Sequence, residues 1–272
     1  MPATIAAKRS EFRRLHGAGC FIIPNPWDIG SAKLLAHAGF KALASTSAGF
    51  AWAQGVPDGA APLASILTHL SELAGAVSVP VNADFENGYA DDTATLEINV
   101  MRAAATGVAG LSIEDATGNA EHPLYDFDQA VERVLVARRA LDQSPTGGEP
   151  ALLTARSEGF IRCRPDLAET CRRLAAFAAV GADCLYAPGI KTAAEIAAVV
   201  KAVAPKPVNL LVPPTGLSFD EAAALGVRRL SIGGALARAA WGETQRIAQE
   251  MMAGSFAGLK RAATSAEVEK TL

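Results

Sequence analysis

The chain alternates eight times between a short apolar segment and a longer segment rich in alanine and leucine. The short segments have the length and character of buried strands, and the longer ones those of helices. Strands are expected at 21–24, 42–45, 80–84, 110–114, 151–156, 184–187, 208–212 and 229–232. Helices are expected at 29–37, 63–74, 93–105, 127–141, 166–179, 193–203, 219–224 and 236–252.

Glycines mark the ends of several of these helices. Ala38-Gly39, Thr106-Gly107, Val180-Gly181 and Leu225-Gly226 each precede a strand by a few residues. Glycine adopts the left-handed conformation that commonly ends a helix, so these pairs indicate tight turns. Eight strand–helix units over about 250 residues predict a (β/α)8 TIM-type barrel. A doubly wound open sheet is the alternative, but no G-x-G-x-x-G follows the first strand.

Length and composition restrict the class of protein. The 272 residues, half of them hydrophobic, suit one barrel domain over 1–272 with a polar C-terminal tail at 258–272. The net charge of −3 and the scattered basic residues give no nucleic-acid-binding surface. Residues 1–14 lack the apolar core of a signal peptide, and no apolar run is long enough to span a membrane. Four cysteines without paired spacing suit reduced thiols, so we expect a cytoplasmic protein. From its charge and its apolar runs we expect it to bind neither nucleic acid nor membrane.

Acidic residues directly follow the third and fourth expected strands. Asp84 and Glu86 lie two residues apart, so in an extended strand their side chains project on the same side. Neighbouring carboxylates raise one another's pKa, and a cation between them relieves the repulsion. Glu114 and Asp115 close the next strand. The carboxyl ends of barrel strands meet on one face, so these acids are expected there as oxygen ligands for Mg²⁺ or Mn²⁺.

The ends of other strands offer groups that suit an anionic substrate. Arg156, at the end of the fifth strand, suits a bidentate contact with a carboxylate. The backbone at Ser47 and Ala48 offers N–H donors to an anion. A metal, an arginine and backbone amides together suit a small 2-oxo acid that passes through an enolate. Further substrate contacts are expected from Trp27, Tyr186 and Asn209.

Two other residues have alternative interpretations. Asp58 suits either a turn with Gly59 or a place beside the metal. His122 lies in a polar loop and suits either an ordinary surface position or a proton donor.

These segments together resemble the isocitrate lyase/phosphoenolpyruvate mutase superfamily, from about residue 21 to residue 241. Residues 84–89 resemble its Asp-x-Asp-x-Gly-Phe/Tyr metal motif, with Glu86 in place of the second aspartate. Residues 113–115 resemble its Ile-Glu-Asp strand end, and residues 155–158 its Ala-Arg-Thr-Asp/Glu segment. Residues 45–49 and 55–58 resemble its Ser-Gly turn and the Gly-x-Pro-Asp that follows.

The resemblance implies a (β/α)8 barrel whose last helix is exchanged between subunits of a homo-oligomer, a dimer of dimers. It also implies 2-oxo acid binding and enolate chemistry at a metal site. The implied metal ligands are Asp84, Glu86 and Glu114, with Asp58 nearby, and the implied substrate contacts are Ser47, Ala48 and Arg156. We expect the catalytic residues to be Arg156, Glu114, Asp58 and His122, with His122 as the candidate proton donor.

The loop after Asp115 departs from the family pattern. The lyases carry a catalytic cysteine there, and the mutases and phosphonopyruvate hydrolases carry a lysine and an asparagine. Residues 116–124 contain neither cysteine nor lysine. We therefore expect a Mg²⁺-dependent C–C lyase or decarboxylase that acts on a small 2-oxo (di)acid. The alternatives are a phosphonomutase or phosphonopyruvate hydrolase, and a non-catalytic 2-oxo acid-binding protein.

Overall fold

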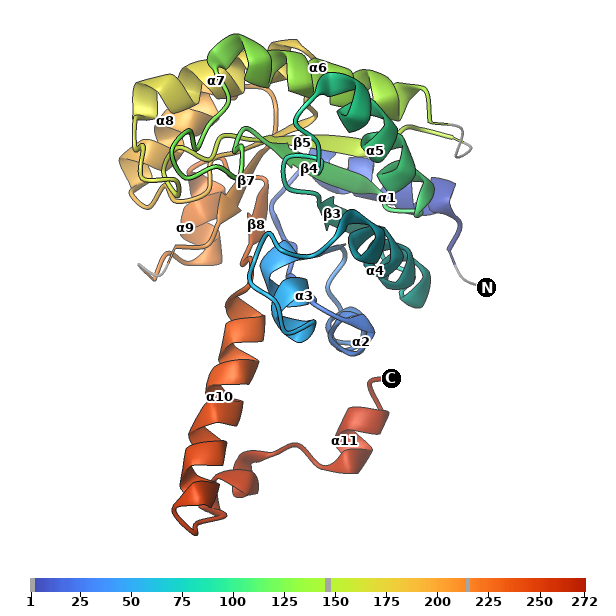
Figure 1. Cartoon of the computed structure of the whole chain (residues 1–272), viewed down its shortest axis with the longest axis vertical. Coiled ribbons are helices and arrows are strands. Elements are labelled where there is room, and N and C mark those ends of the chain that lie inside the picture. The colour runs from blue at the N-terminus through green and yellow to red at the C-terminus, as the bar shows by residue number, and fades with distance from the viewer. Residues whose placement is uncertain (1–2, 145–147, 214–215) are drawn as a thin grey trace.

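The computed structural model describes residues 3–144, 148–213 and 216–272. Its eight strands form one curled parallel sheet in the order β1-β8-β7-β6-β5-β4-β3-β2 (Figure 1). The strands are β1 (Phe21–Ile22), β2 (Leu43–Ala44), β3 (Val81–Asp84), β4 (Gly110–Glu114), β5 (Leu152–Arg156), β6 (Cys184–Tyr186), β7 (Val208–Leu211) and β8 (Arg229–Ser231). The predicted (β/α)8 barrel is confirmed, and each predicted strand is present.

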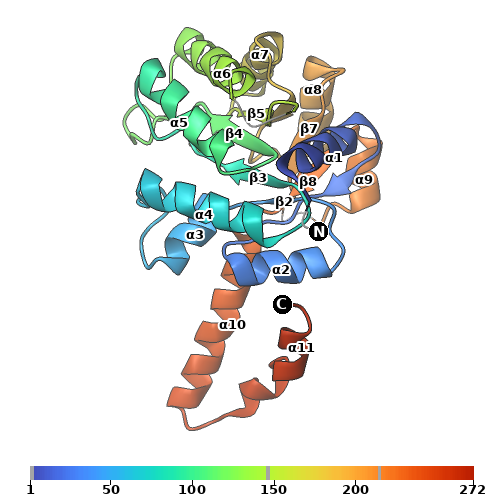
Figure 2. The same ribbon diagram turned by 90° about the vertical axis from the view of Figure 1, so that its right-hand side faces the viewer.

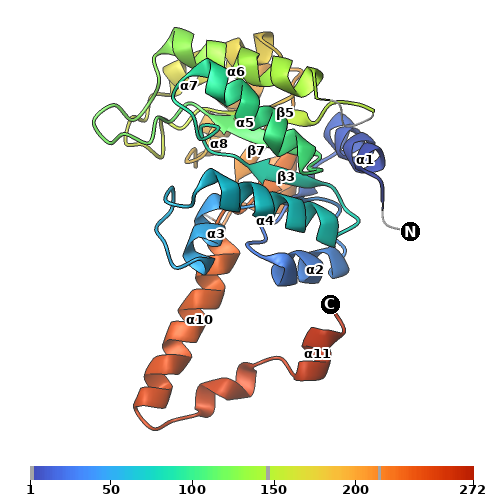
Figure 3. The same cartoon turned by 45° about the vertical axis from the view of Figure 1, so that its right-hand side comes forward.

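Helices surround the sheet, and the predicted ones are all found (Figure 3). They are α2 (Ile29–His37), α4 (Leu63–Ala76), α5 (Thr93–Ala105), α6 (Phe127–Asp142), α7 (Leu167–Ala179), α8 (Ala193–Val203), α9 (Phe219–Ala224) and α10 (Ala235–Met252). Short polar side chains cap most of their first turns. Asp28, for example, accepts a hydrogen bond from the Ser31 amide at 2.7 Å and so begins α2.

Besides η1 (Ala257–Arg261) and α11 (Ser265–Glu269) in the polar tail, two helices of the described residues were not predicted from the sequence pattern. The first, α1 (Ile5–Gly17), lies across one end of the barrel (Figure 2). Its Phe12 and Leu15 pack with Ile23 and Leu152, which closes that end with apolar side chains. The second, α3 (Ser47–Ala53), begins directly after β2, where we expected only a backbone turn.

The barrel is joined between β1 and β2 by a few specific hydrogen bonds. The Ala44 amide donates to the Pro24 carbonyl at 3.0 Å. The buried Asn25 side chain spans the same junction: its Nδ2 donates to the Ser45 carbonyl at 3.1 Å. Its Oδ1 accepts from the amides of Ile232 and Gly233, both at 2.9 Å. One side chain therefore ties β1 to the ends of β2 and β8.

The last helix, α10, extends away from the barrel, and the chain then turns back through η1 (Ala257–Arg261) and α11 (Ser265–Glu269) toward α2 (Figures 1 and 2). Large apolar side chains on this extension are exposed, among them Trp241, Met252 and Phe256. The exchange of this helix between subunits and the dimer of dimers stay predictions. No helix in the described part of the chain has the length and apolar character needed to cross a membrane.

The Asn25 side chain gives a stability prediction. Asn25→Leu leaves the Ile232 and Gly233 amides without their acceptor, and each unsatisfied buried donor costs about 1–3 kcal/mol. We expect the free energy of unfolding in urea to fall by about 2–4 kcal/mol. Asn119→Leu, in an exposed loop, is the control and should change it by less than about 0.5 kcal/mol. Equal stability of the two variants would contradict this account of the junction.

A buried histidine gives a pH prediction. His16 Nδ1 lies 2.7 Å from the Phe12 carbonyl, and its Nε2 lies 3.2 Å from Arg229 Nη1. A carbonyl only accepts and a guanidinium only donates, so the ring is neutral with its proton on Nδ1. Burial, helped by Arg229, lowers the pKa of His16 to about 3.

Stability should therefore fall on acidification. Above the unfolded pKa of about 6.5, both states hold neutral His16 and no effect is expected. As the pH drops from there toward 3, His16 becomes protonated in the unfolded chain but stays neutral in the folded chain. The free energy of unfolding should lose about 2 kcal/mol from this residue by pH 5. His16→Gln should flatten the pH dependence, whereas the exposed His37→Gln should leave it unchanged.

Candidate active site

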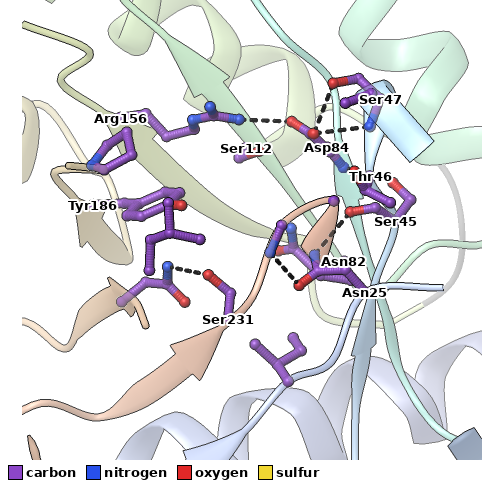
Figure 4. Close-up of a pocket in the computed structure, with 18 of the residues that line it drawn as sticks. Asn25, Ser45, Thr46, Ser47, Asn82, Asp84, Ser112, Arg156, Tyr186 and Ser231 are labelled. Carbon is purple, nitrogen blue, oxygen red and sulfur yellow. Dashed lines mark hydrogen bonds and ion pairs between the residues drawn. The ribbon is translucent and has the colours of Figure 1, made fainter. Parts of the chain in front are cut away.

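Two adjoining hollows open where the carboxyl ends of the strands meet. The inner hollow, of about 160 Å³, lies within the barrel mouth (Figure 4). The outer hollow, of about 530 Å³, lies above it. The residues that line both are Ser47, Asp58, Arg156 and Ile161. The site is therefore one continuous region built from the carboxyl ends of the strands, including the segment after β1, and from the loops that follow them.

Arg156, at the end of β5, lies at the centre of this region. Its Nη1 donates to Asp84 Oδ1 at 2.6 Å, a contact visible in Figure 4. Its Nε and Nη2 both donate to Glu158 Oε1, at 2.9 and 2.7 Å, and Nη2 lies 3.2 Å from Glu114 Oε2. Burial opposes the guanidinium charge, but Glu158, Glu114 and Asp84 outweigh it and raise the pKa of Arg156 well above its usual value. The arginine is therefore a permanent cation inside a ring of acids.

Asp84, at the end of β3, joins the arginine to the start of α3. Its Oδ2 accepts hydrogen bonds from the backbone amide and the hydroxyl of Ser47, both at 3.0 Å. Thr46 caps α3 by accepting from the Gly49 amide at 3.2 Å. The predicted donor segment at Ser47 and Ala48 is thus the first turn of a helix, and both residues line the inner hollow.

Glu86 is presented differently from the prediction. The strand ends at Asp84, and Glu86 has a left-handed φ of 45°, so the two acids do not project together from one strand. Tyr89, also left-handed with φ of 53°, donates its hydroxyl to Glu86 Oε1 at 2.8 Å. Gly88 between them has a φ of 81°, which would strain a residue with a side chain, and a Cβ there would also collide with Leu96 Cδ1. Left-handed residues other than glycine are strained and concentrate at functional sites.

Arg133 on α6 holds this strained turn in place. Its Nη2 donates to the carbonyls of Asn87 and Ala90 at 2.5 and 2.7 Å, and its Nη1 to that of Asp91 at 2.9 Å. The guanidinium lies 4.2 Å from the centre of the Tyr125 ring. This side chain is almost fully buried, so it acts as an internal clamp on the segment that carries Glu86.

The acids of the site outnumber its cations. Asp58, Asp84, Glu86, Glu114 and Glu158 line the hollows, where the described residues supply Arg156 and Arg162 close to them. Burial, with repulsion from Asp84, raises the pKa of Glu86 to about 7. Burial also raises the pKa of Asp58 and of Glu114, the latter well above its ordinary value. Burial is the largest cause of each rise, so a divalent cation among these groups would lower their pKa values and favour the charged carboxylates.

This donor set fits Mg²⁺. The groups are hard oxygen ligands, and Glu158 Oε2 is buried without a hydrogen-bond partner. Within the described residues, no three acids, histidines or cysteines converge closely enough to hold a metal by themselves. Mg²⁺ commonly binds through one or two carboxylates and keeps several waters, which suits such a spread arrangement.

Most predicted site residues are brought together. Asp58, Arg156 and Ser47 line both hollows; Ala48, Asp84, Tyr186 and Asn209 line the inner one; Glu86 and Glu114 line the outer one. Trp27 and His122 line neither hollow. Trp27 packs beside Gly49 at the base of α3, and His122 is exposed in a loop pinned by pairing between Ala116 and Leu124. Their roles in substrate contact and proton donation are not supported by this arrangement.

Several residues of the site were missed from the sequence. Arg162 reaches Glu114 from the loop after β5, Tyr89 holds Glu86, and Arg229 donates to Asn209 within the barrel. Tyr89 belongs to the 84–89 motif but was given no role, and no sequence spacing links Arg162 with Glu114 or Arg229 with Asn209. Asp115, which closes β4, accepts from the Glu158 amide at 2.8 Å and from Arg173 at 3.1 Å, so it supports the loop after β5.

A family model described as phosphoenolpyruvate phosphomutase matches residues 12–252. The chain belongs to this family. The resemblance to the isocitrate lyase/phosphoenolpyruvate mutase superfamily is thereby confirmed, and members of that superfamily are enzymes that act on C–C or C–P bonds.

Similar proteins support the same assignment. A provisionally named lyase/mutase from Burkholderia cenocepacia J2315 is 47% identical, with a TM-score of 0.93 over 98% of this chain and 95% of that one. An uncharacterized protein of Mycobacterium tuberculosis is 28% identical over 82% of this chain and 81% of its own. An oxaloacetate decarboxylase of Bradyrhizobium diazoefficiens is 27% identical over 72% of this chain and 68% of its own. A phosphonopyruvate hydrolase crystallised with oxalate and Mg²⁺ shares the fold at 23% identity, with a TM-score of 0.84 over 97% of this chain and 94% of that one.

The Arg133 clamp gives a prediction. Arg133→Met removes three hydrogen bonds to backbone carbonyls, of which that of Ala90 is buried, and should lower the free energy of unfolding by about 2–3 kcal/mol. Amides of residues 86–91 should exchange with solvent faster, because the strained turn loses its support. Arg139→Met, exposed on the same helix, is the matched control and should change neither quantity. Unchanged exchange in the Arg133 variant would show that the turn holds itself.

Proposed function

We propose that this protein catalyses Mg²⁺-dependent cleavage of a C–C bond in a small 2-oxo acid through an enolate. The observation that supports the proposal is the buried cationic Arg156 within a ring of carboxylates at the carboxyl ends of the strands. A cation and an arginine side by side suit a ligand that carries a carboxylate and a neighbouring oxygen. A 2-oxo acid has both groups on adjacent carbons.

The acids would hold the metal and the arginine would hold the substrate. Asp84, Glu86 and Glu114 are the proposed Mg²⁺ ligands, in part through water, with Asp58 beside them. Bound Mg²⁺ supplies a Lewis acid that stabilises negative charge on an oxygen. Glu158 fixes Arg156 through Nε and Nη2, and Nη1 donates to Asp84, so a substrate carboxylate would accept the second hydrogen of Nη1. Mn²⁺ has similar preferences and is a candidate replacement.

Decarboxylation is the reaction that needs the fewest further groups. When the C3–C4 bond of oxaloacetate breaks, CO₂ leaves and the electron pair forms the enolate of pyruvate. A proton then adds at C3, and solvent can supply it. No nucleophile and no base is needed for bond cleavage, only stabilisation of the charge on the C2 oxygen. The absence of cysteine and lysine from residues 116–124 is compatible with this reaction.

The relatives named oxaloacetate decarboxylase support the same choice. Phosphonate chemistry is the alternative within the superfamily, but residues 116–124 lack the lysine that the resemblance associates with it. We therefore take oxaloacetate as the first substrate to test.

Asp84 provides the test. Asp84→Asn removes a negative charge but keeps the size of the side chain, so Mg²⁺-dependent oxaloacetate decarboxylation should fall by about 100-fold or more. Asp91→Asn, an exposed acid of the following loop, should retain wild-type activity. The measurement is the rate of pyruvate formation with Mg²⁺ and with a chelator.

Two outcomes would count against the proposal. An Asp84→Asn variant with the wild-type Mg²⁺-dependent rate would remove Asp84 from the site. A wild-type protein that binds oxalate with Mg²⁺ but turns over no 2-oxo acid would instead be a non-catalytic binder.

A further inference from the structure

Arg162 places a second guanidinium at the rim of the outer hollow. Its Nη2 lies 3.2 Å from Glu114 Oε1, and its Nε lies 3.5 Å from Glu158 Oε2. The side chain is 42% exposed, whereas that of Arg156 is 13% exposed. One arginine is therefore at the base of the site and the other at its entrance.

The loop that carries Arg162 is well defined. The amides of Ile161 and Arg162 both donate to the Glu158 carbonyl at 3.0 Å, and the Arg164 amide donates to the Gly159 carbonyl at 2.8 Å. The loop also packs tightly on the segment after β6, since a Cβ at Gly189 would lie 2.7 Å from Ile161 Cγ2. These contacts fix the backbone from which the side chain of Arg162 extends to Glu114 and Glu158.

Glu114 lies between the two guanidinium groups. One of its oxygens faces Arg156 and the other faces Arg162. Among the described residues that line the outer hollow, these two arginines are the only cationic side chains. The loop after β4 adds none, because residues 116–124 contain no lysine or arginine.

A purely structural role for Arg162 explains less of this arrangement. Charge-assisted contacts that fix a structure are commonly about 2.7–2.9 Å long, and both contacts of Arg162 are longer. Arg162 is 42% exposed although Glu114 and Glu158 are buried, so solvent screens the charge of its guanidinium. Glu114 and Glu158 already have the buried Arg156 as a partner. Arg162 therefore has binding capacity that the fold does not use.

We propose that Arg162 binds the second carboxylate of a dicarboxylic 2-oxo acid whose 2-oxo acid end lies at Arg156. The inference rests on the function proposed above and adds the substrate class: diacids in preference to monoacids of the same chain length. Arg162 is thus a specificity residue. A charge-assisted hydrogen bond of this kind corresponds to roughly 10- to 100-fold in affinity.

The sign of its effect on turnover follows from the chemistry. If the second carboxylate leaves as CO₂, its negative charge is lost as the bond breaks. A guanidinium bound to it then stabilises the bound substrate more than the transition state. Removing the guanidinium should raise KM without lowering kcat.

Matched ligand pairs test the proposal. Calorimetry with Mg²⁺ would compare 2-oxoglutarate with 2-oxovalerate and oxaloacetate with 2-oxobutyrate, pairs that differ by one terminal carboxylate. Wild-type protein should bind the diacid of at least one pair about 10-fold or more tightly. Arg162→Gln should abolish that preference while leaving oxalate and monoacid binding within about twofold, and should raise KM for a turned-over diacid. Arg164→Gln, an exposed arginine of the same loop outside the lining, should behave like wild type.

The outcomes separate this inference from the proposed function. Equal weakening of mono- and diacids in Arg162→Gln, or a wild type with no preference for diacids, would overturn the role of Arg162 and leave the function standing. Failure of wild-type protein to bind oxalate and every acid of the panel would overturn the proposed function, and this inference with it.

Discussion

The charge of Arg156 is the constraint on which the rest of the site depends. Acids at the ends of neighbouring barrel strands are brought together by topology, and buried carboxylates without a partner are unfavourable. Register pairs Glu114 of β4 directly with Arg156 of β5, and β3 delivers Asp84 to the same guanidinium. Five acids line the hollows beside Arg156 and Arg162, and burial raises the pKa values of Glu86 and Glu114. The remaining negative charge is what makes the site suited to a divalent cation.

The backbone that carries Glu86 into the hollow is strained. Glu86 and Tyr89 adopt left-handed conformations that few residues other than glycine adopt freely. The strain persists because Arg133 and the hydroxyl of Tyr89 hold the turn from both sides. Rigidity around Glu86 is therefore imposed by tertiary contacts and not by the turn itself. A turn shaped in this way keeps an acid in the hollow that would otherwise move into solvent.

Much of this structure follows from the sequence, and the exceptions have physical reasons. Periodicity and helix-ending glycines predict the eight strand–helix units, and strand ends then identify Asp84, Glu114 and Arg156. The helix α1 was missed because its charged sequence hides the apolar face that Phe12 and Leu15 form. Arg133 and Arg162 were missed because a long side chain reaches partners that sequence spacing does not reveal. The prediction for His122 was based on residue type alone, and its loop leaves it exposed.

The polar interior of the barrel links its two ends. Such interiors are usually filled by branched apolar side chains. Here Arg229 donates to Asn209 at 2.7 Å, and Asn209 donates to Ser231 at 2.9 Å. These three residues line the inner hollow together with Tyr186, whose ring lies 5.3 Å from the guanidinium carbon of Arg156. Directional bonds allow fewer arrangements than apolar packing, so this polar chain restricts the shape of the hollow below the anion-binding arginine.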